Sequence, residues 1–213
     1  MILVSEVYYP YICDMDAKKL EILERASNVY MKYGIKSITM DDLASELGIS
    51  KKTIYKYFED KNELIQSIIV LKAEMDRAMC LECQLNSKNA IDNLINISSL
   101  VVEHLGNVNS TVFYDLKKYY PDAWGILETH KWEFILSMIR DNINKGIEEN
   151  LYREDLDPNI ISRLYVASTD ALLDTGVFPW PEYQFQDVFS QMIRLQICGM
   201  VSEKGRKYLK QNP

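Results

Sequence analysis

Three helix-start signals follow one another closely in the first third of the chain, and they constrain the fold more than any other feature. Thr39 is followed three residues later by Asp42, as in a capping box with Asp in place of the usual Glu or Gln. Ser50 is a good N-cap, and Asp60 begins a third helix in the same way. Gly48 separates the first two starts. The pattern therefore predicts two short helices joined by a tight turn, followed by a longer helix.

Two short helices joined by a glycine-containing turn form a helix-turn-helix unit, which we place at residues 39–58. A helix precedes the unit, because apolar residues recur at helical spacing from Ile22 to Tyr33 before Gly34. A further helix is expected over 61–84. Residues 15–71 are therefore predicted to form a small helical domain.

The rest of the chain is also expected to be helical, which predicts an all-α fold. The 8 glycines and 6 prolines among 213 residues are about half of average usage, and such a shortage of helix breakers favours long helices. We assign residues 72–213 to a second helical domain, with a polar, basic tail from Lys204. Residues 1–14 form an N-terminal extension of open status. The helices expected in the second domain span 88–106, 109–119, 122–150, 157–176 and 183–203.

The net charge of −7 argues against nucleic acid when the chain is taken as a whole, but the charge is unevenly distributed. The segment from Ser50 to Lys61 carries four lysines against Glu59 and Asp60, so positive charge is concentrated where a DNA-reading element needs it. The sequence shows no apolar run of membrane-spanning length and four cysteines only. These features predict a reduced, cytoplasmic protein without a membrane partner.

The second of the two short helices has the composition of a DNA-reading helix. At helical spacing, Lys51, Lys52, Tyr55 and Lys56 share one face, while Ile54 points the other way. Lysine contacts guanine acceptors or phosphate, serine and threonine hydroxyls contact either, and tyrosine reaches phosphate. A solvated charged face is the plainer interpretation of such a segment, but the three flanking caps favour DNA binding.

Residues 20–70 resemble the DNA-binding domain of the TetR-type bacterial transcriptional regulators. The resemblance rests on Gly34, on the segments 38–44 and 47–58, and on Lys61-Asn62-Glu63-Leu64. One departure is Lys52, where many members have glycine, and the added charge can alter base preference. Thr39 is then implied to cap a helix and touch phosphate. By the same resemblance the groove is entered by Ser50, Lys51, Lys52 and Thr53, and the DNA backbone is held by Tyr55, Lys56 and Lys61.

The resemblance also implies a homodimer that binds operator DNA and whose helical second half binds a small-molecule effector. Aromatic residues gather in the middle of that half, as in a ligand cavity, although ordinary core is the more frequent explanation for any single residue. The candidate effector contacts are His104, Tyr114, Trp124, His130, Phe134 and Met138.

The last two expected helices are apolar over more than one face, which favours a dimer interface over a deep monomer core. The candidate interface residues are Leu164, Ala167, Ala171, Phe189, Met192, Ile193 and Ile197.

Other functional classes find little support in the sequence. Cys80 and Cys83 form a C-x-x-C pair, but no second pair completes a zinc site, so we expect no metal and no cofactor. Asp170, Asp174 and His130 do not make a recognisable catalytic constellation. The chain is thus predicted to be a DNA-binding regulator, most simply a repressor released by an effector. Two alternatives stay open: a helical ligand-binding protein or enzyme without a DNA role, and a regulator controlled by a protein partner.

Overall fold

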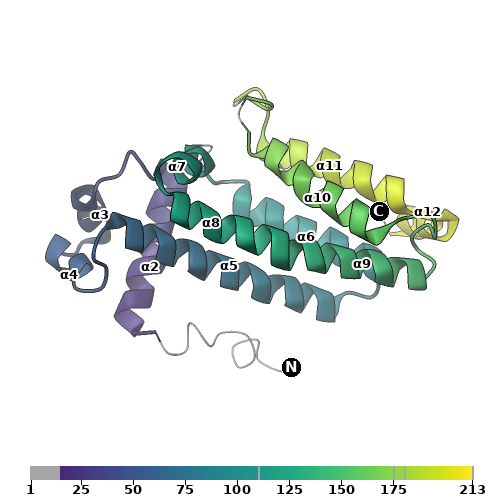
Figure 1. The fold of residues 1–213 in the computed structure, drawn as a ribbon, viewed down its shortest axis with the longest axis horizontal. Coiled ribbons are helices and arrows are strands. Elements are labelled where there is room, and N and C mark those ends of the chain that lie inside the picture. Colours follow the sequence, from purple (N-terminus) through teal and green to yellow (C-terminus); the bar gives the residue numbers. More distant parts are fainter. Residues whose placement is uncertain (1–14, 110, 175, 180, 213) are drawn as a thin grey trace. The chain divides into compact units, whose positions relative to one another are not determined.

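The computed structural model describes residues 15–109, 111–174, 176–179 and 181–212, and over these residues the fold is all-α, as predicted (Figure 1). The extension at residues 1–14 lies outside the described residues. Within the described part, no helix combines the length and the apolar character that crossing a membrane requires.

The described residues divide into two compact units. The first unit comprises residues 15–79 and 107–129, except position 110, and the second comprises 80–106 and 130–212 with the gaps given above. The first unit contains α2 (Ala17–Tyr33), α3 (Met40–Leu47), α4 (Lys51–Tyr55), most of α5 (Lys61–Asn86), α7 (Thr111–Tyr119) and α8 (Pro121–Thr129). The second contains the end of α5, α6 (Ala90–Leu105), η2 (His130–Ile135), α9 (Leu136–Glu148), α10 (Pro158–Leu172), α11 (Phe185–Met200) and α12 (Glu203–Gln211).

These packing units differ from the domain boundary expected at residues 71 and 72. Helix α5 runs through that point without a break, and α7 and α8 pack with the first unit. Packing units are not functional domains, so the boundary stays a prediction.

Two stretches of secondary structure differ from the sequence-based expectation. The single helix expected over 122–150 is α8, the π-helical turn η2 and α9 in succession. The tail expected to be merely polar forms α12, capped by Ser202, whose Oγ accepts from the Gly205 N–H at 3.1 Å. Hydrophobic period alone reports neither feature, because η2 lies within an otherwise continuous helical stretch and α12 has few apolar residues.

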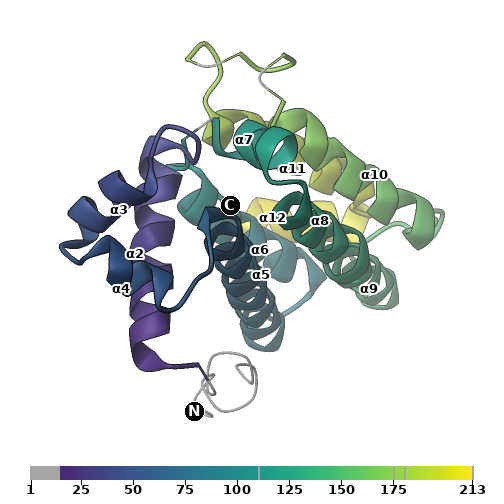
Figure 2. The same ribbon diagram turned by 60° about the vertical axis from the view of Figure 1, so that its left-hand side comes forward.

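The core of the first unit holds the helix-turn-helix against α2. Ile22, Leu23 and Tyr30 of α2 are buried with Leu43 of α3 and Ile54 of α4. Figure 2 shows α3 and α4 lying beside α2. The short helices α3 and α4 are therefore fixed by tertiary packing, which helices this short require.

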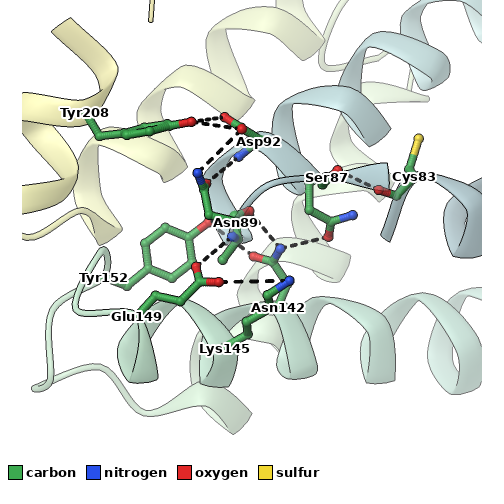
Figure 3. Close-up of polar contacts among 11 residues, drawn as sticks. Cys83, Ser87, Asn89, Asp92, Asn142, Lys145, Glu149, Tyr152 and Tyr208 are labelled. Carbon is green, nitrogen blue, oxygen red and sulfur yellow. Dashed lines mark hydrogen bonds and ion pairs between the residues drawn. The ribbon is translucent and has the colours of Figure 1, made fainter. Parts of the chain in front are cut away.

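The second unit has its own apolar core, locked by a buried polar network between α6 and α9 (Figure 3). The Asn142 amide donates to the Ala90 carbonyl and to Asn93 Oδ1, both at 2.9 Å, and the Tyr152 hydroxyl donates to Asn142 Oδ1 at 3.2 Å. On α12, the Tyr208 hydroxyl lies 2.8 Å from Asp92 Oδ2, so the C-terminal helix is tied to the start of α6.

Candidate nucleic-acid interface

The N-terminus of α3 is built by the predicted capping box. Thr39 Oγ1 accepts from the Asp42 N–H at 3.2 Å, and Asp42 Oδ2 accepts from the Thr39 N–H at 2.9 Å. The hydrogen bonds from the Thr39 hydroxyl and N–H lower the pKa of the Asp42 carboxyl, so it stays ionised at the positive end of the helix.

The turn between α3 and α4 has the geometry that its glycine predicts. Gly48 adopts a left-handed conformation, with φ of 65°. Its N–H donates to the Ser45 carbonyl, and the Ile49 N–H donates to the Ala44 carbonyl, each at 3.0 Å, which is a Schellman closure. Ser50 then caps α4 by accepting from the Thr53 N–H at 3.1 Å. The turn and the cap together set the direction in which α4 leaves α3.

Helix α4 presents the predicted polar face to solvent. Ile54 is fully buried, whereas Ser50, Lys52, Tyr55 and Lys56 are exposed. These four residues, with Thr53 and Tyr57, line an open depression of about 620 Å³. We call this set of six residues the α4 face. Its lysine, hydroxyl and phenol groups can contact both base edges and phosphate oxygens.

Lys51 differs from its neighbours on α4 because its ammonium has a partner. Lys51 Nζ lies 2.8 Å from Asp41 Oδ2 of α3, and both side chains are well exposed. The hydrogen bond to Asp41 raises the pKa of Lys51. An exposed pair of this kind adds little stability, so a phosphate can replace the carboxylate.

Lys61 is directed into the first unit. Its Nζ donates to the carbonyls of Ile35 at 2.6 Å and Ile38 at 2.5 Å, in the turn between α2 and α3. Burial lowers the pKa of Lys61, and the charges of Asp115 and Asp42 oppose this effect. The Lys61 ammonium is thus directed to the turn before α3, and its implied backbone contact stays untested.

Sequence patterns do not reveal the residues of α7 and its approach that hold this turn and the end of α2. The Lys36 N–H donates to the nearly fully buried carboxylate of Asp115 at 2.8 Å, and the Asn109 N–H donates to the Met31 carbonyl at 2.7 Å. Lys36 Nζ also donates to the Tyr119 hydroxyl at 2.8 Å, and this bond lowers the pKa of Tyr119. A single apolar-flanked aspartate such as Asp115 gives no such signal in sequence.

The candidate effector contacts fall in both units. Tyr114 is exposed on α7 and its hydroxyl accepts from Lys118, while Trp124 packs against the first core. His104 lies on α6, where its Nδ1 is 2.8 Å from the Leu100 carbonyl oxygen. In the second unit, His130 and Phe134 of η2 stack at 5.2 Å between ring centroids, and Met138 packs against the second core. A role for these residues in effector binding stays a prediction.

The candidate dimer residues also divide into two groups. Leu164, Ala167 and Ala171 are exposed along one face of α10. On α11, however, Phe189, Ile193 and Ile197 are buried in the second core, and Met192 is half-buried against it. The structure thus places Phe189, Ile193 and Ile197 in the protomer core, and a dimer role for the candidate residues stays a prediction. The apolar residues that point outward from α11 are Leu195 and Cys198, beside Gly199.

The cysteine pair and Asp170 are the other residues that the sequence singled out. Cys80 is buried. Burial raises the pKa of the Cys83 thiol, the charge of Glu82 adds to this effect, and the raised pKa makes the thiol less reactive. Among the described residues, no group of His, Cys, Asp and Glu is arranged to hold a metal ion. Asp170 accepts from Lys131 Nζ of η2 at 2.5 Å, so it serves as an ion-pair partner.

Comparison with known proteins agrees with this geometry. Residues 22–68 match the family model of bacterial regulatory proteins, tetR family. The chain is 26% identical over 158 residues to YvaF of Bacillus subtilis (strain 168), an uncharacterized HTH-type transcriptional regulator. That alignment covers 72% of this chain and 77% of the relative.

Similarity extends over most of the chain for a second relative. The HTH-type transcriptional repressor KstR2 of Mycobacterium tuberculosis (strain CDC 1551 / Oshkosh) is 21% identical over 196 residues, covering 89% of this chain and 96% of the relative. The solved structure of the ketosteroid transcriptional regulator KstR2 of Mycobacterium tuberculosis superposes with a TM-score of 0.58 at 22% identity, over 89% of this chain and 97% of that chain. At this identity the superposition establishes a common fold.

Proposed function

We propose that the chain is a DNA-binding transcriptional regulator of the TetR family, and that it is a repressor that binds a pseudo-palindromic operator as a homodimer. A small-molecule effector releases it from the operator. The name of the relative KstR2, a transcriptional repressor, supports the sign of regulation.

The observation that carries the proposal is the α4 face. Ile54 anchors α4 in the core, and the cap at Ser50 fixes the start of the helix. The polar side chains of the α4 face are therefore directed to solvent. Lys52, Tyr55 and Lys56 are the residues that we assign to the DNA. The Ser50 and Thr53 hydroxyls lie 2.8 Å apart, and each can contact a base edge or a phosphate.

The homodimer is proposed to form through the outward face of α10 and α11. Ile160, Leu164, Ala167 and Ala171 recur at spacings of four, three and four residues, and all are exposed. Helix α11 packs against α10 and adds Leu195, with Cys198 and Gly199. Exposed apolar residues on two adjacent helices are typical of a surface that a partner covers. Two copies of this face are the symmetric solution that most homodimers use.

The effector is proposed to be a small, partly apolar molecule bound by the second unit. The stacked rings of His130 and Phe134 support a binding role for η2, because π-helical turns are frequent at functional sites. The relative KstR2 is described as a ketosteroid transcriptional regulator, which is in line with an apolar effector class.

The test is operator binding by variants of the α4 face. A duplex selected from a random pool by the wild-type chain is labelled, and binding is followed by fluorescence anisotropy at several salt concentrations. We expect the triple variant Lys52→Ala, Tyr55→Ala, Lys56→Ala to lose at least a hundredfold in affinity. The Lys207→Ala variant, which removes an exposed lysine from α12, is the matched control and keeps wild-type affinity. Failure of the wild-type chain to select any sequence would contradict the proposed function.

A further inference from the structure

We propose that Lys61 is a positioning residue for DNA recognition: it holds the turn before α3 in place and does not contact the DNA backbone. The proposal rests on the function proposed above, and it assigns a role opposite to the one that the sequence resemblance implies for this lysine.

Lys61 already uses two of its hydrogen-bond donors within the first unit. An ammonium group has three N–H donors and no acceptor. Two of the donors are directed to the carbonyls of Ile35 and Ile38, which lie in the turn between α2 and α3. A phosphate that drew the ammonium out of the turn would break these bonds and leave two carbonyls of a packed turn without their donor.

The surroundings of the Lys61 ammonium also stabilise its charge. Lys61 Nζ lies 5.3 Å from the ring centroid of Tyr30, which is fully buried, and 6.0 Å from that of Tyr120. Both rings favour a cation at this position. Asp115 and Asp42 face the ammonium with opposite charge, so the half-buried cation is compensated within the unit. An operator phosphate is not needed to balance it.

The turn that Lys61 holds leads directly into the first residue of α3. Thr39, the N-cap of α3, directly follows Ile38, whose carbonyl Lys61 binds. One residue beyond Ile35, the Lys36 N–H is bound by Asp115 of α7. Lys61 of α5 and Asp115 of α7 therefore both form hydrogen bonds to this one short turn. Because α4 follows α3 through a tight turn, a displacement at Ile38 is carried to the α4 face.

The proposal is tested by the salt dependence of binding to the selected duplex. Loss of one phosphate contact lowers the slope of log K against log salt by about 0.9, whereas a positioning defect lowers affinity without changing the slope. We expect Lys61→Met to bind at least tenfold more weakly with the wild-type slope. Lys56→Met, which removes an exposed lysine of the α4 face, is the matched control whose slope falls. A slope that falls equally in Lys61→Met would overturn the proposal.

Lys61→Arg separates the two roles further. Arginine keeps the charge and reaches phosphate, but its planar guanidinium does not reproduce an ammonium placed between two carbonyls and two rings. We expect this variant to be as defective as Lys61→Met, and wild-type affinity in Lys61→Arg would contradict the proposal.

Hydrogen exchange at the Lys36 amide gives a readout that needs no DNA. In both Lys61 variants we expect this amide to exchange faster, because the turn that presents it to Asp115 is no longer held. Unchanged exchange in both variants would also overturn the proposal. If the wild-type chain selects no DNA, the proposed function fails, while the exchange experiment still tests whether Lys61 holds the turn.

Discussion

At the scale of single residues, the two glycines on either side of α3 adopt positive φ for different reasons. Gly48 has φ of 65°, and a Cβ added there would meet nothing within 4 Å. Gly34 has φ of 86° and ψ of 154°, a region that is essentially restricted to glycine, and its Cβ would lie 2.7 Å from Thr111 Oγ1. Glycine is therefore needed at position 48 only for the left-handed backbone conformation. At position 34 it is needed for the backbone conformation and because Thr111 leaves no room for a Cβ.

This difference predicts unequal costs for the two alanine substitutions. We expect Gly48→Ala to lower the free energy of unfolding by about 1 kcal/mol, the ordinary cost of a left-handed alanine. Gly34→Ala should cost about 3 kcal/mol, because strain and the contact with Thr111 add. Urea denaturation of both variants measures the two values. Equal destabilisation would show that the approach of Thr111 to Gly34 does not constrain the turn.

Residue-level prediction from sequence succeeded where the relevant partners are local. Thr39 with Asp42, Ser50 with Thr53, and Asp60 with Glu63 are all capping interactions within three residues, and all three are present. Lys61 shows the limit: its acceptor carbonyls lie 26 and 23 residues away, and backbone carbonyls leave no mark in a sequence. A lysine at a helix start fits a phosphate contact and a buried turn equally well until the fold is known.

At the scale of elements, a buried amide side chain joins α6 to α9. Asn142 is nearly fully buried, donates to Ala90 and Asn93, and accepts from Tyr152. We expect Asn142→Ala to destabilise the chain by about 2–4 kcal/mol, since the substitution strands buried polar partners. Tyr152→Phe, which removes only one hydroxyl at the edge of the same network, should cost less.

Thermal unfolding followed by circular dichroism checks this order. A smaller loss in Asn142→Ala than in Tyr152→Phe would mean that Asn142 is not the central member of the network.

Sequence predicted which elements exist better than how they join. The period of apolar residues identified α2 and the helix-turn-helix because each has one buried and one exposed face. It did not separate α8 from α9, because η2 adds one residue per turn to an otherwise continuous helix. It also missed α12, which is held by Tyr208 bonded to Asp92 and by the close approach of Gly205 to Leu151, not by a broad apolar face.

At the scale of the whole molecule, α10 and α11 each carry two apolar faces, and the sequence does not tell which of them lies in the protomer core. The sequence indicates that these helices bury more than one side, but the period is the same for the face in the protomer core and for the outward face. Phe189, Ile193 and Ile197 proved to belong to the core, while Leu195, two residues from Ile193, points outward with 75% of its surface exposed. Only the packing of α11 against α6 and α10 assigns the two faces.

The outward position of Leu195 gives a direct test of the proposed homodimer. A charge placed on a symmetric apolar interface appears twice, once from each copy, so Leu195→Glu should make the chain monomeric and weaken operator binding by at least tenfold. Leu85→Glu is the matched control, because Leu85 of α5 is 77% exposed and lies away from α10 and α11 in the sequence. Both substitutions remove similar exposed apolar surface, so a general effect on solubility affects both alike. Sedimentation equilibrium over a range of concentrations measures the association constant. A dimer that survives Leu195→Glu but is lost in Leu85→Glu would move the interface to the end of α5.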